Sequence, residues 1–149
     1  MVDRAARRVT TSSDLRLASL RVTNSSLASP ATGPPLSEFE MSWLKHFMWR
    51  IDRLQEVYGS RVAMTKLEMR ASDYVRERTV HGWIDDGLGT EIVEFLGADK
   101  VMWGSDFPHP DGIWPDSQEF IEREMGHLPD IVRRKTTYDN AANLYGFPI

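Results

Sequence analysis

The sequence contains no cysteine, which excludes disulfide bonds and any metal site built on thiolates. A metal ion would therefore be held by His, Asp or Glu, whose ligand atoms suit Zn, Mn, Fe or Mg. No apolar run approaches the roughly 18 residues that a membrane-spanning helix requires. The formal net charge of -4 gives no general basic footprint for nucleic acid. These absences predict a soluble, cytoplasmic protein whose partners are neither membranes nor nucleic acids.

Several familiar catalytic motifs are absent as well. The chain has no phosphate-binding loop, no Gly-x-Gly-x-x-Gly, no Gly-x-Ser-x-Gly and no His-x-His. No single motif in this chain therefore supplies a complete active site.

The composition changes at about residue 35. Residues 1–35 are rich in Ser, Thr, Ala and Arg, hold five arginines against two aspartates, and contain no aromatic residue. Such a stretch buries too little apolar surface to offset its ordering entropy, so we expect it to be disordered. A targeting peptide and a nucleic-acid-binding arm are the alternatives. Residues 36–149, with 13 basic and 20 acidic residues, form the expected folded domain.

Hydrophobic spacing in residues 36–149 predicts strands that alternate with helices. The expected strands are 79–84 and 101–106. The expected helices, in chain order, are 42–58, a short one after Ser72, 88–96, 117–125, 129–136 and 138–145. This order indicates an α/β fold with parallel strands joined by right-handed crossovers. Two strands are too few for a stable parallel sheet, so the pattern predicts part of a larger architecture.

Local signals set the expected ends of these helices. Ser72 is a plausible N-cap, and Asp116 with Glu119 three residues later resembles a capping box. Leu88 is expected to begin the apolar stripe of its helix, and Gly97 to end that helix.

An apolar strand that ends in Asp106 is the most informative stretch of the chain. Parallel α/β enzymes keep their chemistry at the C-terminal ends of strands. Alternation along the strand puts Gly104 on the same face as Asp106, which leaves room for a metal or substrate beside the carboxylate. Asp106 is therefore the leading candidate for a catalytic or metal-binding residue, with an N-cap or turn carboxylate as the alternative.

Five further residues are weaker candidates. His109 sits between two prolines on the loop over the strand tip and could bind substrate or approach a metal. Trp114 could line a substrate mouth or plug the loop. His81 lies in the earlier strand, where a buried, hydrogen-bonded structural role is favoured over metal ligation. Asp85 and Asp86 could reach the same site or cap the next helix, and capping is the favoured interpretation.

The run Trp-Gly-Ser-Asp-Phe-Pro-His-Pro at 103–110 resembles the last-strand motif of the amidohydrolase-related family, the metal-dependent TIM-barrel hydrolases and decarboxylases. The resemblance extends to Asn-Ala-Ala-Asn-Leu-Tyr-Gly at 140–146 and back to 37–43, so it covers roughly 36–149. It implies that 36–149 is the C-terminal portion of a TIM (β/α)8 barrel, comprising its last two or three βα units.

The same resemblance implies roles for individual residues. Asp106 corresponds to the eighth-strand aspartate, which contacts the catalytic divalent metal (Zn, Mn or similar) and acts as an acid or base. His109 matches the family's loop histidine, and with Trp114 it is a candidate for binding a small-molecule substrate. The implied activity is hydrolysis of a C–N or C–O bond in a small organic substrate, with non-oxidative decarboxylation as the alternative.

The chain also departs from the family pattern. The family's His-x-His pair and mid-barrel histidines have no counterpart, and a TIM barrel requires around 250 residues. We therefore expect a fragment that is inactive alone. A non-catalytic binding or assembly module, which would dimerise through exposed strand edges, and complementation by a polypeptide that supplies the missing strands are the alternatives.

Overall fold

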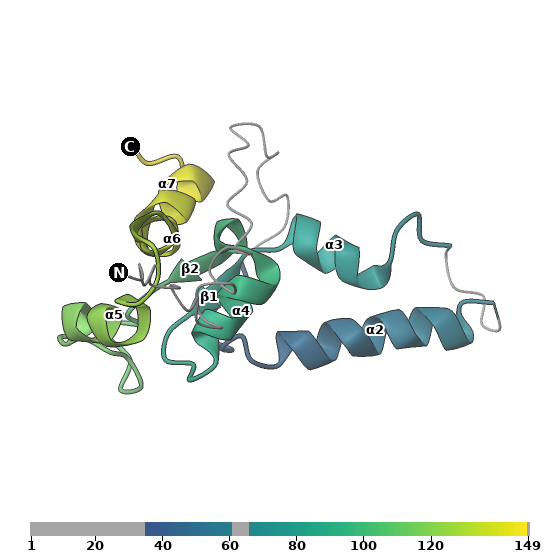
Figure 1. The fold of residues 1–149 in the computed structure, drawn as a ribbon, viewed down its shortest axis with the longest axis horizontal. Coiled ribbons are helices and arrows are strands. Elements are labelled where there is room, and N and C mark those ends of the chain that lie inside the picture. Colours follow the sequence, from purple (N-terminus) through teal and green to yellow (C-terminus); the bar gives the residue numbers. More distant parts are fainter. Residues whose placement is uncertain (1–34, 61–65, 149) are drawn as a thin grey trace, which may run out of the picture.

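The structure, a computed structural model, describes residues 35–60 and 66–148. The expected disordered segment, residues 1–35, lies outside this range except for its last residue. The described part has the mixed α/β character that the sequence predicts, with helices arranged around a small central sheet (Figure 1). No helix in the described part is long and apolar enough to cross a membrane.

The sheet consists of two short parallel strands, β1 (His81–Trp83) and β2 (Val101–Trp103), paired in order from His81 opposite Val101. Both strands lie inside the ranges expected from the sequence. Leu36 forms an isolated parallel bridge on the other edge of β1. The segment before the first helix therefore runs alongside β1.

The helix α2 (Leu44–Tyr58) is confirmed, and α3 (Ala71–Arg78) packs beside it (Figure 1). The expected N-cap role of Ser72 is wrong, because this residue lies inside α3. Its N–H and hydroxyl group donate to the two carboxylate oxygens of Asp52 at 2.8 and 2.7 Å. A buried acid on α2 thus binds the first turn of α3 and joins the two helices.

The helix α4 (Gly89–Leu96) ends at Gly97, whose φ of 98° takes the chain into the left-handed region, as its role as a stop requires. The expected stripe is shifted, because Leu88 is exposed and Val93 is buried. Gly89 explains the shift, since a Cβ there would lie 2.2 Å from the Trp83 ring. The buried face of α4 therefore contains Gly89, Ile92 and Val93.

The helix α5 (Ser117–Met125) has the predicted bounds, but its expected capping box is wrong. Asp116 is the N-cap residue and makes no side-chain capping hydrogen bond. Its φ of -87° and ψ of 20° lie outside the extended region from which capping side chains usually reach back to the helix.

The last two expected helices form one continuous helical run. It consists of α6 (Asp130–Arg134), the π-helical turn η2 (Lys135–Asp139) and α7 (Asn140–Tyr145). A single π turn thus replaces the expected break between the helices. Gly146, with a φ of 72°, ends the run directly after the expected last residue, 145.

The buried core is assembled from the sheet and from segments on either side of it. Its members are Met41, Leu44, Trp83, Ile92, Val93, Ala98, Val101, Met125, Leu128 and Val132. The segment 98–100, a short 3-10 turn called η1, leads from α4 into β2 through this core. The loop after β2 therefore starts from a firmly packed strand.

Candidate functional site

The loop after β2 carries the leading candidate, Asp106. The strand ends at Trp103, and Asp106 has a φ of 56°, so strand alternation does not extend to it and the expected sharing of a face with Gly104 is wrong. A Cβ at Gly104 would meet nothing within 4 Å, so there is open space at this position before Asp106. A left-handed backbone at a residue other than glycine is uncommon and is often found at functional sites.

Backbone hydrogen bonds hold this loop in place. The N–H of Gly104 donates to Trp83 at 3.0 Å, which ties the loop to the end of β1. The N–H of Ile113 donates to the carbonyl of Ser105 at 2.9 Å and closes the loop. Gly112 lets the two arms approach, because a Cβ there would lie 2.8 Å from the same carbonyl.

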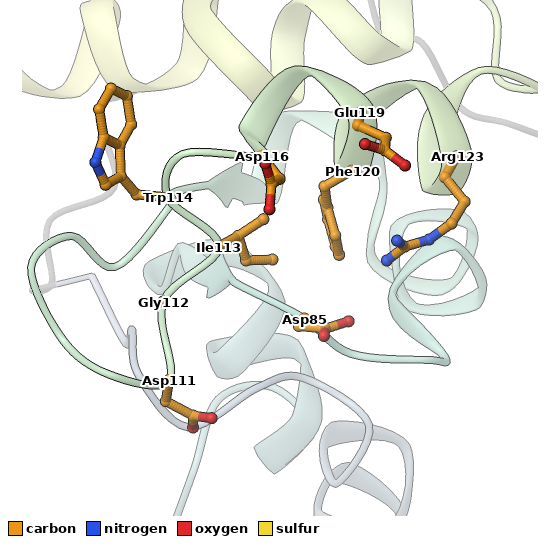
Figure 2. Close-up of a pocket in the computed structure, with 9 residues that line it drawn as sticks. All are labelled: Asp85, Asp111, Gly112, Ile113, Trp114, Asp116, Glu119, Phe120 and Arg123. Carbon is orange, nitrogen blue, oxygen red and sulfur yellow. The ribbon is translucent and has the colours of Figure 1, made fainter.

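The far side of the loop forms a wall of an open pocket of about 290 Å³ (Figure 2). The residues that line it are Asp85, Asp111, Gly112, Ile113, Trp114, Asp116, Glu119, Phe120 and Arg123. Trp114, the predicted mouth or plug residue, is 62% exposed and packs edge-on against Phe107. Its side chain thus lies at the pocket's rim, which is compatible with the substrate-mouth interpretation.

The structure brings His109 to Asp106. The Nδ1 atom of His109 donates to the Oδ1 atom of Asp106 at 2.9 Å, within a turn closed by a second bond from the His109 N–H to the Asp106 carbonyl. The Asp106 side chain is only 14% exposed, whereas the imidazole is 58% exposed. The hydrogen bond and the charge of Asp106 raise the pKa of His109 above its ordinary value, and Glu38 adds to this effect.

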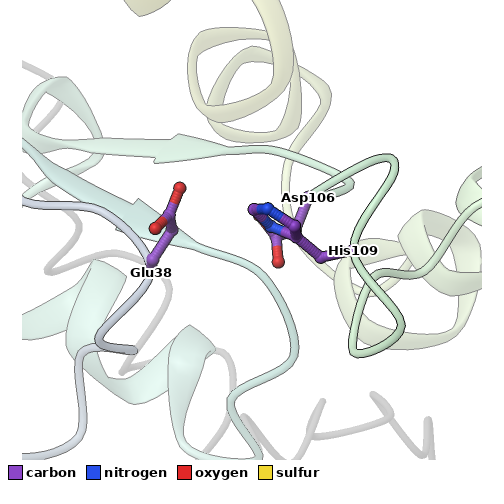
Figure 3. A group of neighbouring side chains, drawn as sticks. All are labelled: Glu38, Asp106 and His109. Atoms are coloured by element: carbon purple, nitrogen blue, oxygen red, sulfur yellow. The ribbon is translucent and has the colours of Figure 1, made fainter.

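Glu38 completes a cluster that the sequence did not predict (Figure 3). One ligand atom from each of Glu38, Asp106 and His109 lies within 4.8 Å of the others. Glu38 also has a left-handed backbone, with a φ of 66°. Two of the three cluster residues are therefore held in an unfavourable backbone conformation at the same place.

Contacts with β1 place Glu38 in the cluster. Leu36 donates to Val80 and accepts from Gly82, at 2.9 and 2.7 Å, so the chain leaves this strand pairing two residues before Glu38. Gly82 permits the approach, since a Cβ there would lie 2.6 Å from the Cβ of Ser37. The signal for Glu38 was its position in the segment 37–43 that resembles the family, because its spacing alone gave no indication.

The expected helix-capping role of Asp86 is wrong, because Leu88 is the N-cap residue of α4 and no side chain caps that helix. Asp86 instead binds the backbone on both sides of the site. Its carboxylate accepts from the N–H of Leu88 at 3.0 Å and from those of Met41 and Ser42 at 2.7 Å each. It is 5% exposed, and burial raises the pKa of its carboxyl group, but a hydrogen bond from the Ser42 hydroxyl group and the three backbone hydrogen bonds lower this pKa below its ordinary value. Asp85 lies on the pocket instead. Asp86 is therefore structural and fixes the chain just after Glu38.

The predicted structural role of His81 is confirmed. Its ring is 1% exposed, and its Nε2 atom lies 2.8 Å from the hydroxyl group of Thr79, which itself donates to the Val75 carbonyl. Burial lowers the pKa of His81 to about 4, with a contribution from the charge of Lys100. A neutral, enclosed imidazole is unsuited to ligation in the loop cluster.

The cluster of Glu38, Asp106 and His109 offers two carboxylate oxygens and one imidazole nitrogen. Oxygen and imidazole ligands suit Zn and Mn, and three protein ligands with open remaining positions are typical of catalytic zinc sites. Two of the side chains are exposed and can adjust their rotamers. The donor set therefore fits a divalent cation.

Comparisons with known proteins show what this chain is similar to. A family model described as Amidohydrolase matches residues 31–147. No curated protein matches the chain.

Among solved structures, 5-carboxyvanillate decarboxylase LigW from Sphingomonas paucimobilis superposes with a TM-score of 0.60 at 21% identity, over 71% of this chain and 31% of that one. An amidohydrolase, map2389c, from Mycobacterium avium subsp. paratuberculosis K-10 gives a TM-score of 0.59 at 21% identity, over 72% of this chain and 26% of that one. The chain thus spans less than a third of either neighbour, and the likeness concerns the fold.

Proposed function

Because the chain belongs to the amidohydrolase family, we propose that it carries part of the active site of a metal-dependent hydrolase that cleaves a C–N or C–O bond in a small organic substrate. The observation that supports this proposal is the convergence of Glu38, Asp106 and His109 beyond the C-terminal ends of β1 and β2. Parallel α/β folds keep their catalytic residues at this end of the sheet.

The three cluster residues are the proposed metal ligands. Asp106 is the central one, because it is the least exposed of the three and follows a core strand. A divalent cation, Zn or Mn, would supply a Lewis acid and a water of lowered pKa when bound. Asp106 is also placed to accept a proton from a nucleophilic water.

His109 makes metal binding depend on pH in this proposal. Its hydrogen bond to Asp106 stabilises the imidazolium, so that metal binding by the imidazole must displace a proton. Trp114 and the pocket behind the loop are the proposed site of substrate contact. In this proposal, Asp106 and His109 hold and move protons, and the neighbouring residues 111–114 of the same loop contact the organic group.

We further propose that the chain is the C-terminal portion of a TIM barrel and binds metal without turnover by itself. The described residues contain two paired strands, whereas a closed barrel has eight. The imidazole of His109 is more than half exposed, so that water would surround any reacting group. Additional barrel strands would enclose the site, either from the same polypeptide or from a complementing one.

Non-oxidative decarboxylation is the second candidate. It is supported by the decarboxylase among the structural neighbours, which acts on 5-carboxyvanillate according to its name. Two assays distinguish the reactions: CO2 release from 5-carboxyvanillate, and release of nitrophenol from p-nitrophenyl acetate as a probe of C–O hydrolysis.

Calorimetric titration with Zn²⁺ and Mn²⁺ tests the metal site directly. We expect Asp106→Asn to weaken binding at least about 100-fold, because even changes to outer-shell residues commonly cost 10–100-fold in affinity. Asp130→Asn is the matched control, since Asp130 is an exposed aspartate on α6 that pairs with Arg133. Equal affinities in the two variants, or absence of binding in the unaltered chain, would contradict the proposal.

A further inference from the structure

Asn140, at the start of α7, makes two short hydrogen bonds to the backbone that leads into β2. Its Nδ2 group donates to the carbonyl of Ala98 at 2.6 Å and to that of Val101 at 2.7 Å. One amide thus joins the turn η1 to the first residue of the strand. These contacts act on the strand β2, whose following loop carries Asp106 and His109.

The pairing of the strands shows which side of β2 Asn140 occupies. The N–H of Gly104 donates to Trp83 on β1, and neighbouring residues of a strand turn their backbone groups to opposite sides. Met102 and Gly104 therefore face β1, whereas Val101 and Trp103 face the outer edge. The Asn140 amide occupies the outer edge at Val101, where a further strand would pair.

The π turn η2 helps to bring Asn140 to this edge. In an α-helix, residues five positions apart lie about 140° apart around the axis, whereas a π turn, with its i→i+5 hydrogen bonds, brings them close to one face. Lys135 and Asn140 are five positions apart at the ends of this turn. Lys135 forms an ion pair with Asp99 in η1, next to the carbonyl of Ala98 that Asn140 binds. The side chains of Lys135 and Asn140 therefore both bind residues of η1.

From these contacts we propose that Asn140 is a positioning residue that fixes β2, and thereby sets where Asp106 lies relative to Glu38. Only Gly104 and Ser105 separate the end of β2 from Asp106, so a displacement of the strand carries the carboxylate with it. Glu38 is placed by a different contact, the pairing of Leu36 with β1. The inference rests on the proposed metal site, because a metal detects the distance between these two acids.

The test compares variants of the full chain by Mn²⁺ affinity, measured by electron paramagnetic resonance. Asn140→Asp keeps the side-chain shape but replaces the donor group with an acceptor, and Asn140→Ala removes it. We expect either change to raise the Mn²⁺ dissociation constant at least about tenfold, the lower end of outer-shell effects. Asn143→Ala, which alters an exposed asparagine of the same helix, should leave the constant unchanged.

A variant of lowered stability separates positioning from simple destabilisation. Val132 is fully buried in α6 of the same helical run, so Val132→Ala should lower the melting temperature without touching the outer edge of β2. Unchanged Mn²⁺ affinity in both Asn140 variants, or equal weakening by Val132→Ala at a matched melting temperature, would overturn the inference.

Amide hydrogen exchange at residues 102–106 provides a readout without metal. We expect faster exchange there in the Asn140 variants than in Val132→Ala. If the unaltered chain binds no Mn²⁺, the proposed metal site fails, and this comparison alone decides the role of Asn140. Equal exchange in all variants would then overturn it.

Discussion

His81 shows how strongly one buried side chain can make stability depend on pH. Its folded-state pKa of about 4 lies below the ordinary value of 6.5. Between these two pH values the unfolded chain binds a proton that the folded chain does not, so the free energy of unfolding falls as the pH falls. The full effect is about 3 kcal/mol, lost progressively from about pH 6.5 down to pH 4.

Urea unfolding between pH 4 and pH 8 measures this effect as a difference between variants. His81→Gln replaces the ring with a group that does not titrate, so the variant should lack this part of the slope. His127→Gln changes an exposed histidine and should keep the slope of the unaltered chain. If His81→Gln retains the full slope, other groups cause the pH dependence.

Prediction from sequence worked at the residue scale where one local pattern carried the information. Asp106 and His109 stand three positions apart after an apolar strand, and the structure brings them into hydrogen-bond contact. Glu38 is 68 positions from Asp106, and its proximity depends on the pairing of Leu36 with β1. This pairing could not be predicted from the sequence, because a single bridged residue produces no periodic hydrophobic pattern.

At the scale of elements, the end of α4 offers a clean backbone test. Gly97 has a φ of 98°, and a Cβ there would meet nothing within 4 Å, so a substitution strains only the backbone. We expect Gly97→Ala to lower the free energy of unfolding by about 1–2 kcal/mol. Gly87→Ala is the control, because Gly87 has equal space and no left-handed φ.

Thermal and urea unfolding of the two glycine variants give the comparison. The expected result is a clear loss for Gly97→Ala and a change of less than about 0.5 kcal/mol for Gly87→Ala. Equal stability of the two variants would show that the turn after α4 relaxes to accept a side chain.

The bounds of the helices were easier to predict than the side of each helix that is buried. The bounds of α2, α4 and α5 follow from hydrophobic spacing, because that spacing records burial over several turns. The stripe of α4 was misassigned because Gly89, which has no side chain to add to a hydrophobic pattern, lies against the Trp83 ring. The π turn was missed for a similar reason, since one extra residue in a helix changes its phase without changing its composition.

At the scale of the whole molecule, metal binding should stabilise the chain by mass action. A cation at 100 times its dissociation constant raises the free energy of unfolding by about 2.7 kcal/mol when it binds only the folded state. We expect Zn²⁺ or Mn²⁺ to produce this shift in the unaltered chain and at most about 0.4 kcal/mol in Asp106→Asn, whose affinity is at least about 100-fold weaker. Unfolding curves with and without the cation provide the measurement.

A non-catalytic assembly module makes the opposite prediction. Phe39, Phe107 and Trp114 are 70, 65 and 62% exposed, and apolar groups of this size can serve as contacts between chains. Such a module would elute as a stable dimer in size-exclusion chromatography and show no change in stability with metal. This outcome would replace the hydrolase proposal.

The α/β class was predictable because the hydrophobic spacing indicates strands and helices that alternate along the chain. The number of strands in the complete sheet was not, because it is a property of the whole sheet and the described residues contain only β1 and β2. The resemblance at 103–110 therefore predicted the family, but it did not predict how many strands the described residues form.

The carboxylate of Asp86 has a consequence for how the chain folds. It binds the backbone before α2 and the backbone before α4, which lie more than 40 residues apart. Contacts of such sequence separation form late, since a long loop must close before they contribute. The starts of the two helices should accordingly fold and unfold together as one cooperative unit. When the turn after β1 unfolds, Glu38 should therefore leave the site.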